Sequence, residues 1–170
     1  MILKNQNKFI FLQTKSFIAL LFAGLVVIGY VLHKDYGISL DEESTRFHGI
    51  VSLNYICEIL FPNQKFEFQI NNFIPKLHQY EFKEYGVFFE ILLIVIIEIL
   101  FEVKNFAEIF YNRHFLNHFL FLIAVICFYF VCNDIFKNKI YSFFGSAILY
   151  TSPRIFAQSF YNDKDLVFLS

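Results

Sequence analysis

The stretch 115–132, FLNHFLFLIAVICFYFVC, decides the fold class of this chain. It contains 18 residues without a formally charged side chain. As a helix it would rise about 27 Å, close to the ~30 Å hydrocarbon core of a bilayer. A polar and basic run, NDIFKNK, follows it at 133–139. We therefore predict a membrane-spanning helix over 115–133 and a cytoplasmic turn over 134–139.

The composition of the whole chain agrees with a membrane protein. Of its 170 residues, 57% are hydrophobic and 21% are aromatic, which excludes an ordinary soluble domain. The net charge is −1, so the chain has no general attraction for nucleic acid. Cys57, Cys127 and Cys132 form no CxxC pair and are expected to be packing residues. The predicted class is all-α, as a multi-pass membrane protein.

Two further apolar segments are predicted to cross the membrane. Residues 16–33 follow a basic leader, 1–15, which places the N-terminus in the cytoplasm by the positive-inside rule. A cleaved signal peptide is the alternative, but the run is long and lacks a small-residue cleavage site. Residues 140–161 form the return crossing, in which Pro153 can kink the helix and Arg154 can reach the interface.

The long segment 34–114 is then expected outside the cell. Apolar residues recur at helical spacing over 48–61, which predicts an interfacial helix. Residues 64–70 alternate with a period of two, which favours an extended strand-like segment. The run 86–103 contains three glutamates, each costing about 2.5 to 3.5 kcal/mol at a bilayer centre, so we expect a re-entrant or interfacial helix.

The charged side chains of these external segments give the candidate site. Asp41, Glu42 and Glu43 follow the first crossing, and because adjacent carboxylates repel one another they should face water, a cation or a substrate. A merely solvated loop is the alternative. Glu98 and Glu102 are one helical turn apart and are expected to form a wet helix face. An external link over 162–165 and the start of a further span over 166–170 complete the predicted order.

Four motifs in this order resemble one family of membrane enzymes. They are LDEESTRFHG at 40–49, YGVFFE at 85–90, RHFLNH at 113–118 and SPRIFAQSFYNDKD at 152–165. Together they resemble bacterial polyprenyl-phosphate-sugar glycosyltransferases of the GT-C fold, a superfamily that includes protein O-mannosyltransferases and the lipid A aminoarabinose transferase. The resemblance covers residues 16–170 and implies that the chain is the N-terminal, truncated part of a larger inner-membrane enzyme.

The resemblance also implies roles for individual residues. Asp41 would be the general base of an inverting displacement, and Glu42 would help to orient the acceptor. Glu90 and Asp165 would line the same chamber and bind sugar groups or a divalent cation, Mg²⁺ or Mn²⁺. Two arginines would neutralise the phosphate of the polyprenyl donor, because a guanidinium matches phosphate oxygens. These arginines are Arg113 and Arg154.

Other functions remain open at this point. His114 and His118 have a spacing that can bind zinc, although packing is the favoured interpretation. The chain could be a non-catalytic membrane subunit or an inactive remnant of such an enzyme, and the isolated 170 residues are expected to be inactive. A small transporter is disfavoured because the spans lack paired glycine or proline breaks. The sugar and the acceptor are not specified by the sequence.

Overall fold

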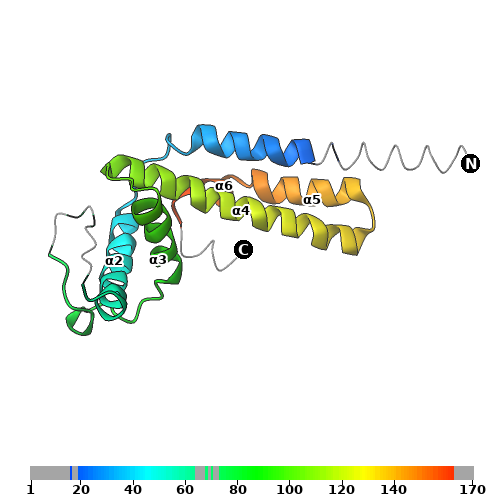
Figure 1. The fold of residues 1–170 in the computed structure, drawn as a ribbon. Helices are drawn as coiled ribbons and strands as arrows, with labels where there is room; N and C mark the ends of the chain where they lie inside the picture. Colours follow the sequence, from blue (N-terminus) through cyan, green and yellow to red (C-terminus); the bar gives the residue numbers. More distant parts are fainter. Residues whose placement is uncertain (1–15, 17–18, 64–67, 69, 71–72, 163–170) are drawn as a thin grey trace, which may run out of the picture.

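The computed structural model describes residues 16, 19–63, 68, 70 and 73–162. Within this part of the chain the regular elements are all helices, with no strand (Figure 1). The all-α prediction is therefore confirmed. The leader 1–15 and the C-terminal residues 163–170 lie outside the described residues.

The longest helix is α4, Phe106–Phe136. Asn105 caps its start, because the side-chain Oδ1 accepts hydrogen bonds from the backbone N–H groups of Ala107 at 3.0 Å and Glu108 at 3.3 Å. The helix ends at Lys137, whose φ of 51° is left-handed. Its 31 residues rise about 46 Å. In the described part of the chain, α4 is the one helix long and apolar enough to cross a membrane.

Three helices accompany α4 (Figure 1). They are an apolar helix at Ala19–Leu32, α5 at Lys139–Thr151 and α6 at Pro153–Tyr161. These helices meet α4 in an apolar core that contains Phe121, Leu122, Val125 and Tyr150. Residues of the first helix pack against this core. Van der Waals packing of these side chains holds the helices of the bundle together.

The predicted return crossing, 140–161, is divided into α5 and α6. Ser152 lies between them with an extended backbone, and Pro153 is the first residue of α6. Proline lacks an N–H group and disfavours a helical conformation at the residue before it, so the break occurs where the sequence places Pro153. Neither α5 nor α6 alone is long enough to span a bilayer.

A second group of helices lies across one end of the bundle (Figure 1). It consists of α2 at Leu40–Leu60, α3 at Phe88–Ile94 and a π-helical continuation, η2, at Val95–Leu100. A short 3₁₀ helix, η1, occupies Leu77–Gln79. Ile50, Leu53, Cys57 and Ile94 form the core between α2 and α3. Together α3 and η2 rise only about 20 Å. Whether 86–103 lies at the interface stays a prediction.

The start of α2 differs from the sequence interpretation. The helix begins at Leu40 rather than near residue 48, so the acids Asp41, Glu42 and Glu43 form its first turn. Negative side chains are favourable there because they interact with the positive end of the helix dipole. The segment 64–70, expected to be extended, lies largely outside the described residues, although Phe68 is buried.

Candidate functional site

Asp41 and Glu42 have opposite environments. The side chain of Glu42 is only 1% exposed, whereas Asp41 is exposed. The backbone N–H of Ser39 donates to Glu42 Oε2 at 2.7 Å, which satisfies one of the unpaired donors at the start of α2. The other carboxylate oxygen, Oε1, lies 2.8 Å from His114 Nε2. Both oxygens of Glu42 are therefore engaged, whereas the carboxylates of Asp41 and Glu43 are exposed.

His114 connects three segments. It is completely buried on α4, and its Nδ1 lies 3.1 Å from the backbone carbonyl oxygen of His33, just after the first helix. Its Nε2 meets Glu42 on α2. One imidazole therefore joins the end of the first helix, the start of α2 and the long helix α4.

Glu90 and Arg113 form a second buried pair beside His114. Arg113 Nη2 donates to Glu90 Oε2 at 2.7 Å, and the two side chains are 1% and 7% exposed. Glu90 lies on α3, directly against Gly49 of α2. Removing a charge from water is costly, so each of these groups is stable inside the protein because its partner is present.

A third pair joins α2 to η2. Arg46 binds Glu98 through two hydrogen bonds, Nε to Oε1 at 2.9 Å and Nη2 to Oε2 at 2.7 Å. This is the bidentate geometry that a planar guanidinium favours with a carboxylate. The prediction that Glu98 and Glu102 form a solvent-exposed helix face is wrong for Glu98, whose side chain is only 6% exposed in this pair. Glu102 is exposed.

His118 lies one turn after His114 along α4 and has different partners. Its Nδ1 is 2.7 Å from Ser159 Oγ, and its ring stacks on Phe160 with centroids 4.3 Å apart. Asn117 also faces α6, since its Nδ2 donates to the Phe160 carbonyl at 3.1 Å. Among the described residues, no three potential ligands are grouped as a metal site. The two histidines therefore serve different contacts and pack between helices.

The segment between the first helix and α2 packs against α6. The ring of Tyr36 stacks on Phe160, with centroids 4.3 Å apart and planes 15° apart. Burial, followed by the charges of Tyr161 and Asp35, raises the pKa of the Tyr36 hydroxyl, so the phenol stays neutral at physiological pH. This contact brings the described part of the motif, 152–162, to the same end of the bundle as the start of α2.

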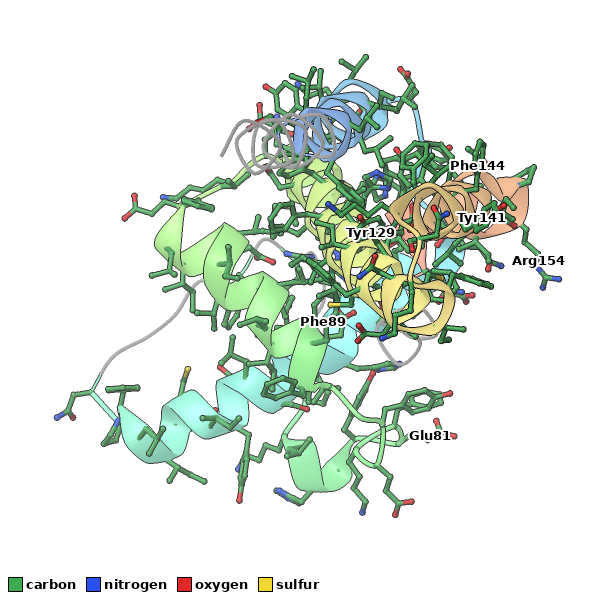
Figure 2. The ribbon with its side chains drawn as sticks, turned by 90° about the vertical axis from the view of Figure 1, so that its right-hand side faces the viewer. Glu81, Phe89, Tyr129, Tyr141, Phe144 and Arg154 are labelled. Atoms are coloured by element: carbon green, nitrogen blue, oxygen red, sulfur yellow. The ribbon has the colours of Figure 1, made fainter. Side chains whose placement is uncertain are left out.

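The structure thus brings together part of the predicted site. Glu42, Glu90 and Arg113 lie at the junction of α2, α3 and α4. Asp41 precedes Glu42 in the first turn of α2 and is exposed, and no described contact joins it to Glu90 or Arg113. Arg154 projects outward from the edge of the bundle (Figure 2). Asp165 lies outside the described residues. The sequence interpretation did not single out Arg46, although its spacing of four residues from Glu42 on one helix face indicated a shared environment.

The described residues do not fit a divalent cation at Glu90. Its carboxylate is already compensated by Arg113, whose fixed positive charge would repel a metal ion at the same oxygens. No step of a reaction is therefore assigned to a metal here. For chemistry, the site presents the exposed carboxylate of Asp41. Buried ion pairs hold in place the helix end that carries it.

Comparison of the chain with known protein families, with curated proteins and with solved structures gives no match. No relative therefore bears on the GT-C resemblance, which stays a prediction from the four motifs.

Proposed function

We propose that this protein is a membrane glycosyltransferase of the GT-C type, or the N-terminal part of one, acting at the outer face of a bacterial inner membrane. The donor is a polyprenyl-phosphate-linked sugar, and the acceptor is a protein, lipid or glycan. The observation that carries the proposal is the environment of Asp41. Its carboxylate is exposed at the end of the membrane bundle, on a helix start that Glu42 and His114 hold rigidly.

In this proposal Asp41 removes the proton of the acceptor as the acceptor attacks the anomeric carbon, and the bond from that carbon to the polyprenyl phosphate breaks. A carboxylate can do this only where it can reach the acceptor, and exposure of Asp41 meets that condition. Glu42 supports the site by positioning, because both of its oxygens are occupied inside the protein. The exposed Arg154 is the better candidate for the donor phosphate, since Arg113 is committed to Glu90.

The proposed topology is multi-pass with a cytoplasmic N-terminus. The first helix, α4 and the pair α5 and α6 would be the three crossings, and α2 and α3 would lie along the outer interface. The parallel course of the bundle helices supports this arrangement (Figure 1). So does the set of large apolar side chains that α4 and α5 expose on their outer surfaces, which include Phe119, Ile123, Phe130, Ile140, Phe144 and Ile148.

Substitution of Asp41 tests the catalytic assignment. We expect Asp41→Asn in the full-length gene product to lower sugar transfer by about 10²-fold or more, since general base catalysis contributes about 10² to 10⁴. The measurement is incorporation of label from polyprenyl-phosphate mannose, glucose or N-acetylglucosamine in native membranes.

Glu43→Gln is the matched control. Glu43 is a neighbouring, exposed acid in the same helical turn, so its loss changes the local charge equally. Transfer should be retained in this variant. Equal activity of Asp41→Asn and the wild type would remove Asp41 from the mechanism. Absence of transfer from every donor in the wild type would favour the alternative of a non-catalytic membrane subunit.

A further inference from the structure

The helices α3 and η2 carry two charged residues, both glutamates, and both are held in buried ion pairs. Glu90 Oε2 accepts a hydrogen bond from Arg113 of α4 at 2.7 Å. Glu98 accepts two hydrogen bonds from Arg46 of α2. Each carboxylate is therefore compensated inside the protein, where an unpaired charge would be costly. The two helices consequently present no formal charge on their outer side.

The π-helical turn helps to keep the second glutamate on the buried side. In a regular α-helix, the spacing from Glu90 to Glu98 would be about 2.2 turns, so the two side chains would point about 80° apart. A π-helix closes its hydrogen bonds from i to i+5, so it is wider and rotates less per residue. The six residues of η2 reduce the offset. Glu98 therefore points inward, next to the buried Ile97.

The exposed side of this segment is entirely apolar. Within 88–101, the exposed residues are Phe88, Leu92, Leu100 and Phe101, and Phe88 is 82% exposed. These four side chains are called the α3 face below. Exposed charged residues flank it at both ends, and these are Lys83, Glu84, Glu102 and Lys104. An apolar face between charged ends is typical of a helix that lies in a membrane surface.

The contacts of α3 and η2 place this face at the start of the predicted span. Leu93 and Ile97 share one core with Ile109 of α4, and Leu116 packs against that core. These positions of α4 lie where the uncharged run 115–132 begins. Figure 1 shows α3 on the side of α2 that lies toward the turn between α4 and α5. With α4 across a bilayer, the α3 face is therefore level with the boundary between headgroups and acyl chains.

We propose that the α3 face binds lipid, with its side chains inserted among the acyl chains of the outer leaflet, next to the headgroups. The proposal rests on the crossing of α4 in the proposed function and needs no sugar transfer. It also fixes the height of Asp41. Its neighbour Glu42 meets His114 at the same level of α4, so Asp41 lies in the headgroup layer. This is the layer in which the phosphate of a lipid-linked donor lies.

A chain without tryptophan permits a direct test. Phe88→Trp and Phe101→Trp each place one fluorophore on the α3 face, in an exposed position that tolerates a larger ring. The full chain is reconstituted in phosphatidylcholine vesicles whose acyl chains carry bromine, a quencher, either near the headgroup or near the chain end. Ile123→Trp, exposed within 115–132, is the membrane control. Phe82→Trp, exposed on the loop before α3, is the aqueous control.

We expect Phe88→Trp and Phe101→Trp to lose most of their emission to bromines near the headgroup, and Ile123→Trp to bromines near the chain end. Phe82→Trp should respond instead to acrylamide, a quencher dissolved in the water. A response of the α3 face to acrylamide equal to that of Phe82→Trp would overturn the proposal. So would protection of both face variants from every quencher, because a second copy or another protein segment would then cover the face.

The lipid contact and the proposed function fail in different ways. Lipid quenching of Ile123→Trp without lipid quenching on the α3 face would overturn the lipid contact and leave the crossing of α4 in place. No lipid quenching of Ile123→Trp would remove the crossing on which both proposals rest. Quenching of the α3 face in a protein that transfers no sugar would support the lipid contact and count against the transferase alone.

Discussion

At the scale of single residues, the helix turn explains why two adjacent acids differ. Successive side chains on a helix point in directions about 100° apart, so Asp41 faces outward when Glu42 faces α4. The same rule places Arg46 one turn after Glu42, on the buried side of α2. Buried charges then accumulate on one helix face, and each requires a partner from a neighbouring element.

The pair of Arg46 and Glu98 gives a prediction at this scale. Glu98→Gln removes the negative charge that Arg46 binds inside the protein and should lower the free energy of unfolding by about 3 kcal/mol. Glu102→Gln is the matched control, because Glu102 is exposed and should be replaceable without effect. Thermal unfolding of both variants in mild detergent, followed by circular dichroism, measures the difference. Equal stability of the two would contradict a structural role for the pair.

At the scale of elements, the close approach of α2 and α3 depends on Gly49. A Cβ atom at this position would lie 2.8 Å from Glu90 Cβ and 2.8 Å from Ile94 Cδ1. These distances are far shorter than van der Waals contact, so any larger side chain would push the two helices apart. The separation of α2 from α3 in turn sets where Glu90 meets Arg113.

Alanine substitution tests this contact. Gly49→Ala should destabilise the protein by about 1 to 3 kcal/mol through overpacking, despite the helix propensity that alanine adds. Gly24→Ala, in the first helix, is the control because no described atom lies within 4 Å of its added Cβ. That variant should be as stable as the wild type or more so, by the same unfolding assay. Destabilisation in both would point to a general intolerance of helix changes rather than to the α2 and α3 contact.

At the scale of the whole molecule, the question is how the bundle sits in a membrane. The helices α2 and α3 lie at one end of α4, and the turn between α4 and α5 lies at the other (Figure 1). If α4 crosses the bilayer, these two ends face opposite compartments. The proposed topology puts the α2 end outside the cell.

Single cysteines at the two ends test this arrangement, in a chain whose natural cysteines are replaced by alanine. In intact spheroplasts, a maleimide that cannot cross lipid should label Glu81→Cys, on the loop before α3, and not Asp134→Cys, near the end of α4. Both positions are exposed, so burial does not affect the comparison. After lysis both should react. Labelling of both positions before lysis would show that α4 does not separate two compartments.

Much of the helical order was predictable from local sequence. The uncharged run 115–132 predicted the middle of α4, because apolar length alone decides whether a helix can span. Pro153 marked the break before α6. The beginning of α2 was missed because the acids of its first turn also suit a solvated loop, and the charge pattern alone does not separate the two.

The sequence by itself determined the helical class and the apolar span. The tertiary structure decided which charges are buried and with which partners. Glu42 meets His114 72 residues away, Arg46 meets Glu98 52 residues away, and Arg113 meets Glu90 23 residues away. Helix periodicity relates only residues within a few turns of each other, so it identifies a buried face but not the partner on another helix. That choice depends on how the helices pack, which is why Asp41 and Glu42 became distinguishable only in the folded chain.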